Sequence, residues 1–127
     1  MKTIDTPSSP ILIVDDEEYI LKSTSRLLRS AGINNVVCCR DSREVMGILS
    51  SQPICAVLLD LSMPHVMGGE LLPQIVALHP DVPVVIITGH PQDVSDIHLA
   101  DLSIEGYIEK PISLQAVLNT LKYLVGE

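Results

Sequence analysis

Aromatic residues are nearly absent from this chain of 127 residues, which has no Trp, no Phe and three Tyr. Hydrophobic residues make up 46% of the sequence and aromatic residues only 2%, so a core has to be built from aliphatic side chains. Branched aliphatic side chains are well suited to buried strands. The length fits one domain and is short for two.

Cysteines are also few, and their spacing forms no motif. Cys38, Cys39 and Cys55 make no Cys-x-x-Cys pair, so the sequence has neither a zinc signature nor a disulfide framework. The first ten residues are polar, and no window has the apolar length of a signal peptide or a membrane span. We therefore expect a cytoplasmic protein with reduced thiols and no contact with a membrane.

Basic side chains are half as numerous as acidic ones. The chain has 8 Lys and Arg against 16 Asp and Glu, which gives a net charge of -8. Binding to a phosphate backbone depends on clustered Lys and Arg. We therefore expect no direct binding of nucleic acid by this chain.

What the sequence does contain is a regular alternation of apolar runs and helical patterns after a short, flexible lead over residues 1–9. The expected strands are Ile11–Val14, Val36–Cys39, the run from Cys55 that ends at Asp60, Val84–Thr88 and Gly106–Glu109. Helical patterns follow each of them: one up to Gly32, one capped by Asp41 or Ser42, one over roughly Glu70–Leu78, a weaker one near Val94–Leu102 and one after Ser113. Five strand and helix pairs predict an α/β fold, with a five-stranded parallel sheet and helices on both faces.

Pro73 interrupts the third helical pattern. A proline beyond the first turn of a helix removes a hydrogen bond and clashes with the preceding turn. We therefore expect this helix to kink at Pro73 or to start late.

Polar side chains stand where the predicted strands end. Three acids follow the first and third strands, namely Asp15, Asp16 and Asp60, while Thr88 and Lys110 stand at the ends of the fourth and fifth. Ligands of parallel α/β sheets bind at these carboxyl ends. Like charges 4 Å apart repel by about 4 kcal/mol at an effective dielectric of 20, so a cation is needed there. Oxygen ligands without His or Cys favour Mg²⁺ over zinc.

Five short segments carry a family resemblance that spans nearly the whole chain. They are Ile13-Val-Asp-Asp-Glu17, Leu58-Leu-Asp-Leu-Ser-Met-Pro64, Gly68-Gly69, Ile86-Ile-Thr-Gly89 and Lys110-Pro111. In order and spacing the chain resembles the receiver domain of two-component response regulators. The resemblance implies that residues 10–127 form a receiver domain with the three-layer, doubly wound (βα)5 flavodoxin-like fold and strand order 2-1-3-4-5.

The resemblance also implies a role for each matching residue. Asp60 is the expected phosphoacceptor, and Mg²⁺, with Mn²⁺ as an alternative, is expected on Asp15, Asp16, Asp60 and the backbone carbonyl of Ser62. Thr88 and Lys110 are expected to contact the phosphoryl group, Tyr107 to be the aromatic switch residue, and Lys110–Pro111 to be a cis peptide.

The implied function is that of a phosphorylation switch and not of a turnover enzyme. The expected donor is a histidine kinase or a phosphotransfer protein, and the expected chemistry is confined to self-phosphorylation and autodephosphorylation. The resemblance allows a homodimer through the surface of the fourth helix, fifth strand and fifth helix, and an output that regulates transcription.

Other interpretations of the same residues remain open. Asp15 and Asp16 alone would also suit the positive end of a helix dipole, and Tyr107 would also suit plain packing in a sheet. Asp60 as the nucleophile of a small-ester phosphatase is a second function, although Ser62 stands where such enzymes place another acid. A degenerate receiver, which acts only as a constitutive interaction surface, is a third.

Overall fold

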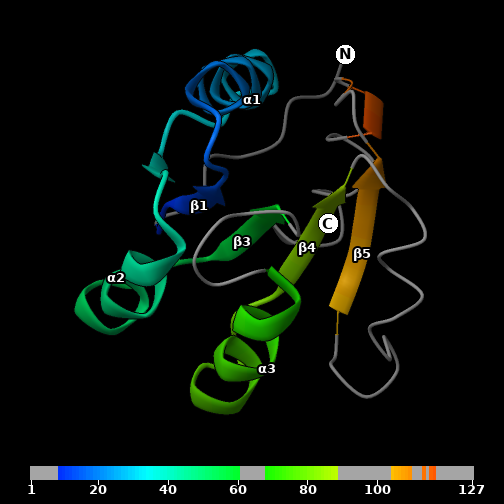
Figure 1. Cartoon of the computed structure of the whole chain (residues 1–127). Coiled ribbons are helices and arrows are strands. Elements are labelled where there is room, and N and C mark those ends of the chain that lie inside the picture. Colours follow the sequence, from blue (N-terminus) through cyan, green and yellow to red (C-terminus); the bar gives the residue numbers. More distant parts are fainter. Residues whose placement is uncertain (1–8, 61–67, 89–103, 110–112, 114, 117–127) are drawn as a thin grey trace.

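The computed structural model describes residues 9–60, 68–88, 104–109, 113 and 115–116, and the side chains of 68–70, 88 and 104–109 lie outside that description. Strands and helices alternate along the chain (Figure 1). The elements are β1 Ile11–Val14, α1 Glu18–Ser30, β2 Val36–Cys39, the 3-10 helix η1 Ser42–Glu44, α2 Val45–Ser51, β3 Ala56–Asp60, α3 Gly68–Leu78, β4 Val84–Thr88 and β5 Ile104–Glu109.

The five strands form one sheet with the order β2-β1-β3-β4-β5, and all neighbouring strands run parallel. β1 and β3 are central, and each pairs with a parallel strand on both sides. The predicted fold, a doubly wound flavodoxin-like sheet of order 2-1-3-4-5, is therefore confirmed.

Two aliphatic cores lie on opposite faces of the sheet, because successive strand residues point to opposite sides. In β1, Ile11 and Ile13 pack with α1, while Leu12 and Val14 pack on the other face. The α1 face also contains Leu21, Leu28, Ile33, Ala56, Leu58, Val85 and Ile87. The opposite face is covered by α2 and α3 through Val45, Leu49, Leu71, Leu72 and Ile75. The helices therefore lie on both faces, as predicted and as Figure 1 shows.

Helix α1 ends at the predicted glycine. Gly32 has a φ of 92°, which is the left-handed region that glycine enters without steric cost. The Ile33 N–H donates to the Leu28 carbonyl at 2.9 Å, closing the Schellman-type turn that usually accompanies such a residue. This turn directs the chain from α1 into β2.

Helix α3 differs from its prediction at Pro73. The helix begins at Gly68, so Pro73 lies in its interior and the expected late start is wrong, whereas the alternative of a kink at Pro73 stays a prediction. Proline inside a helix costs about 3 kcal/mol, and burial of Leu71, Leu72 and Ile75 at 2% exposure or less outweighs that cost. Pro73 itself is exposed, so its ring does not disturb the core.

The predicted cap at Asp41 and the predicted start of a helix after Ser113 are both present. The Asp41 carboxylate accepts a hydrogen bond from the Arg43 N–H at 2.9 Å and so begins η1, which leads into α2. The Ser113 hydroxyl accepts one from the Ala116 N–H at 3.1 Å, and residues 115 and 116 are helical. The predicted helix near Val94–Leu102 and the remainder of the last one lie outside the described residues. No helix in the described ranges is long and apolar enough to cross a membrane.

Candidate functional site

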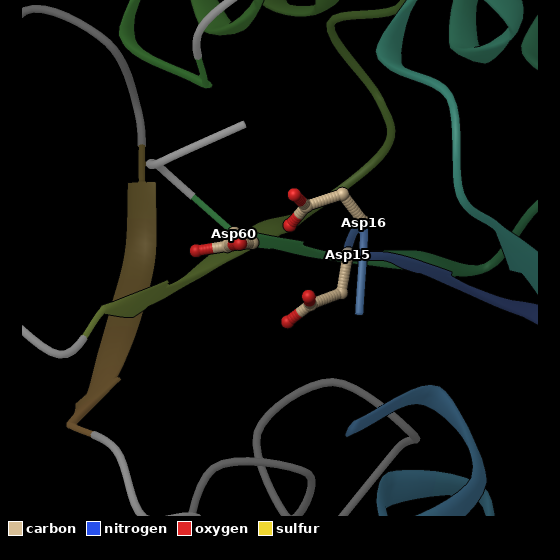
Figure 2. Close-up of side chains that lie close together, drawn as sticks. All are labelled: Asp15, Asp16 and Asp60. Carbon is tan, nitrogen blue, oxygen red and sulfur yellow. The ribbon is translucent and has the colours of Figure 1, made fainter. Parts of the chain in front are cut away.

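The site lies where β1 and β3 end side by side. These strands are parallel neighbours, with Val14 in register with Leu59. The next residue of each chain segment, Asp15 after β1 and Asp60 at the end of β3, therefore reaches the same edge of the sheet. Figure 2 shows the carboxylates of Asp15, Asp16 and Asp60 pointing to the same side of that edge.

The three carboxylates are close enough to share one ion. One oxygen from each of Asp15, Asp16 and Asp60 lies within 4.8 Å of the other two. Asp15 is 1% exposed and Asp60 2% exposed, while Asp16 is half-buried. Acidic side chains are rarely buried this deeply unless hydrogen bonds or positive charge compensate for the lost hydration.

The backbone around the first acid is held in place by hydrogen bonds. The Asp15 N–H donates to the Cys39 carbonyl at 3.1 Å, which ties the residue to β2. The Glu17 N–H donates to the Asp15 Oδ1 at 2.9 Å. This contact was not predicted from the sequence. It is the hydrogen bond of an Asx turn, in which an aspartate carboxylate accepts from the backbone N–H two residues later.

The charge of the cluster has a measurable cost. Two unit charges 4.8 Å apart repel by about 3.5 kcal/mol at an effective dielectric of 20 and by about 0.9 kcal/mol in bulk water. Three such pairs oppose folding unless a cation or a proton offsets them. The site therefore favours ligands that bring positive charge.

The donor set fits a hard divalent cation. All three groups are carboxylates, and the cluster contains neither His nor Cys. Oxygen-only donors suit Mg²⁺ and Mn²⁺ and do not suit zinc or copper, which prefer nitrogen and sulfur. The predicted acidic site is therefore present, with ligand atoms close enough for one ion.

The remaining predicted site residues are placed only in part. Thr88 is the last residue of β4, and its backbone is in register with Glu109 of β5, one residue before Lys110. Tyr107 lies in β5 in register with Ile86. The side chains of Thr88 and Tyr107, together with Ser62, Lys110 and Pro111, lie outside the described residues.

Comparisons with known proteins point to one family. The family model for the response regulator receiver domain matches residues 11–122. Response regulator RR06 of Streptococcus pneumoniae is 31% identical over 115 residues, which are 91% of this chain and 52% of that protein. A putative NtrX-like response regulator of Rickettsia felis is 33% identical over 114 residues, which are 88% of this chain and 24% of that protein. This chain thus corresponds to about half or less of these relatives.

A solved structure gives the same picture for the fold. The crystal structure of a response regulator receiver domain protein from Clostridium thermocellum superposes with a TM-score of 0.82 and 28% sequence identity. The match covers 92% of this chain and 94% of that one. The similarity therefore extends over nearly all of both chains.

Proposed function

Since this chain belongs to the response regulator receiver domain family, we propose that it accepts a phosphoryl group on Asp60 from a histidine kinase or a phosphotransfer protein. The observation that carries the proposal is the cluster of three carboxylates at the ends of β1 and β3, with Asp60 buried among them. A buried carboxylate beside two other acids is suited to a nucleophile that reacts next to a cation.

The proposed transfer moves a phosphoryl group from a histidine nitrogen of the donor to a carboxylate oxygen of Asp60. A carboxylate oxygen of Asp60 attacks the phosphorus of the donor's phosphohistidine, forming a P–O bond as the P–N bond breaks. The imidazole leaves with the electron pair of that bond and takes up a proton. The product on this chain is an acyl phosphate, which carries about one more negative charge than the carboxylate that it replaces.

Asp15, Asp16 and Asp60 would hold Mg²⁺, or Mn²⁺, together with the backbone carbonyl of Ser62. When bound, the ion would supply positive charge that offsets the charge developing on the transferring phosphoryl group. The half-buried Asp16 is the more accessible ligand of the three, and the Glu17 amide orients Asp15. Before transfer, the two positive charges of the metal ion and the one of Lys110 would together neutralise the three carboxylates.

Residues at the strand ends beside Asp60 would contact the phosphoryl group. Asp60 is in register with Ile87, so Thr88 follows immediately at the same edge. We assign the Thr88 hydroxyl and the Lys110 ammonium as phosphoryl contacts, Tyr107 as the aromatic switch and Lys110–Pro111 as a cis peptide. A threonine that moves toward the phosphoryl group and a ring that turns inward would form a two-state element of the kind that switches require.

Receiver domains are signalling modules that interact with histidine kinases or phosphotransfer proteins, and they generally have no turnover activity. We propose that the unit spans residues 10–127 and works in the cytoplasm. Its chemistry would be limited to its own phosphorylation and dephosphorylation. The phosphorylated domain would act through a partner protein or a homodimer, and regulation of transcription would be one output. It would make no direct contact with nucleic acid or membrane.

The test is phosphorylation with a small acyl phosphate donor. The chain is incubated with acetyl phosphate and Mg²⁺ and then analysed by mass spectrometry. We expect a phosphoryl adduct that requires Mg²⁺, that Asp60→Asn abolishes and that Asp81→Asn leaves unchanged, because Asp81 is an exposed acid outside the cluster. An unmodified wild type, an adduct that survives in Asp60→Asn, or sustained hydrolysis of unrelated phosphate esters would contradict the proposal.

A further inference from the structure

A hollow of about 420 Å³ opens between α1 and the end of β2, and none of the three site acids lines it. One wall is formed by residues of α1, and the other by Cys38 and Arg40 at the end of β2. The Ser25 Oγ lies 3.4 Å from the Cys38 Sγ, so the two walls are in contact at this point. β2 is the edge strand of the sheet, so no described strand lies beyond it on this side of α1.

The hollow concentrates the positive charge of an acidic protein. Four of the chain's 8 basic side chains line it, namely Lys22, Arg26, Arg29 and Arg40, against one acid, Glu18. The rest of the chain then has four basic side chains for fifteen acidic ones. A surface with a local charge of about +3 in a chain of net charge -8 is strongly asymmetric and attracts anions at short range.

In the part of the chain that the structure describes, most of this positive charge has no anionic partner. Among the described residues, the guanidinium groups of Arg26, Arg29 and Arg40 make no ion pair and no hydrogen bond. Lys22 faces Glu18 at 4.0 Å, and both side chains are more than half exposed, so this pair contributes little. By contrast, Arg43, which lies outside the hollow, pairs with Asp41 at 2.8 Å. As far as residues 9–60 and the other described segments go, the three arginines have no partner that would compete with an external anion.

The cations form a row and not a point. Lys22, Arg26 and Arg29 follow one another at helical spacings of four and three residues, so they lie on one stripe of α1 that is about 10 Å long. Arg40 adds a cation on the opposite wall. A single phosphate ion touches only one part of such a row, whereas an extended anion with groups one helical turn apart contacts all of it. Arginine forks bind carboxylates in a bidentate manner.

We propose that this hollow, bounded by α1 and β2, binds an acidic segment of a partner protein, with three carboxylates spaced along about one and a half to two helical turns. A nucleic acid is a poorer occupant, because it extends beyond the hollow and meets the acidic remainder of the surface. A short acidic segment avoids that repulsion, since charges beyond about 8 Å are screened at physiological salt. The proposal is independent of phosphorylation at Asp60.

The test uses a labelled helical peptide with Glu at its first, fifth and eighth positions and a matched peptide with Gln in their place. Binding is measured by fluorescence anisotropy at low and physiological salt. We expect the Glu peptide to bind and the Gln peptide not to bind. Arg29→Ala should weaken binding by about threefold or more, and the double variant Arg26→Ala with Arg29→Ala by about tenfold. Arg43→Ala removes the same charge outside the hollow and should leave binding unchanged.

Cys38 provides a second readout in the intact chain. It is exposed and lines the hollow, while burial raises the pKa of the Cys39 and Cys55 thiols and slows their alkylation. The Glu peptide should slow alkylation of Cys38, and Asp60→Asn should not change that protection.

Three results would overturn the proposal: equal binding of the Gln peptide, equal weakening by Arg43→Ala, or an unprotected Cys38 at saturating Glu peptide. Two others would assign the hollow to a different occupant and overturn it as well. These are tighter binding of single-stranded DNA than of the Glu peptide, and protection of Cys38 by self-association as the protein concentration rises.

Discussion

Replacing Asp60 by Asn should stabilise the protein in the absence of divalent cations. The substitution removes one charge from three carboxylates whose oxygens lie within 4.8 Å of one another, and so removes two of the three repulsive pairs. Each pair costs about 0.9 kcal/mol in the dielectric of water and about 3.5 kcal/mol at an effective dielectric of 20. The lower figure sets the expectation, because Asp16 is half exposed and Asn keeps only part of the interactions of Asp60. We expect a gain of about 2 kcal/mol in the free energy of unfolding.

The assay is urea unfolding in low salt with a chelator, followed by the same titration with Mg²⁺. A gain of about 2 kcal/mol corresponds to a rise of roughly 8 °C in the thermal midpoint for a chain of this length. Mg²⁺ at about 100 times its dissociation constant should stabilise the wild type by about 2.7 kcal/mol. The same concentration should have a much smaller effect on Asp60→Asn, which lacks one of the three carboxylates.

Asp81→Asn is the matched control, because it removes one negative charge from an exposed position outside the cluster. Surface charges of this kind change stability by less than about 0.5 kcal/mol. If Asp60→Asn is less stable than the wild type without Mg²⁺, repulsion among the three carboxylates does not limit the stability of the domain. If Asp81→Asn gives the same gain, the effect comes from net charge and not from the cluster.

Two further predictions concern glycine and a buried thiol. Gly47→Ala in α2 should stabilise the protein by up to about 1 kcal/mol, because a Cβ there meets nothing within 4 Å. Gly32→Ala, at a φ of 92°, should instead cost about 1 kcal/mol or more in the same urea titration, and equal effects of the two would contradict the assignment of the α1 terminus. Burial raises the pKa of the Cys39 thiol, so the stability that this group contributes is present below its unfolded pKa of about 8.5 and is lost as the pH rises toward the folded value. Between about pH 8 and 10 the urea midpoint should therefore fall more steeply with pH in the wild type and in Cys38→Ala than in Cys39→Ala. Equal falls in all three proteins would show that ionisation of Cys39 does not destabilise the fold.

The strands and the acidic site were predictable because the same residues determine both. Ile11–Val14 and Ala56–Asp60 are short apolar runs that stop at acids, and a parallel sheet brings such ends to one edge. The neighbourhood of β1 and β3 then follows from the order of the strands. That order was implied by the resemblance to receiver domains, because apolar runs alone predict a parallel sheet without fixing which strands are neighbours.

The start of α3 was not predictable from the proline alone. Propensity places a proline in the first turn or outside the helix, whereas the helix begins five residues earlier, at Gly68. Tertiary packing of the apolar residues around Pro73 decides the outcome, and a rule based on local preference does not include that packing. Side chains of the sheet, remote in sequence, provide it.

The cationic hollow was also not predicted, although three of its four basic residues lie on one helix. Lys22, Arg26 and Arg29 have the spacing of one helical stripe, which the sequence displays. Arg40 joins them only because β2 is the edge strand next to β1 and Cys38 approaches α1. Whether Arg40 lies near the basic stripe of α1 depends on the order of the strands in the sheet, and the number and spacing of charges in the sequence do not give that order.

The position of Asp60 gives the proposed switch its source of free energy. A ligand shifts a conformational equilibrium only through a difference in its interactions with the two states. In the cation-free site the repulsion among the acids supplies such a difference, since it falls when positive charge enters and changes again when the carboxylate becomes an acyl phosphate. Asp60 is paired in register with Ile87 of β4, and Ile87 with Ile108 of β5. In the proposed switch, a displacement at the carboxylate would reach the ends of β4 and β5 across two strand pairs, where Thr88 and Glu109 are the next residues along those strands.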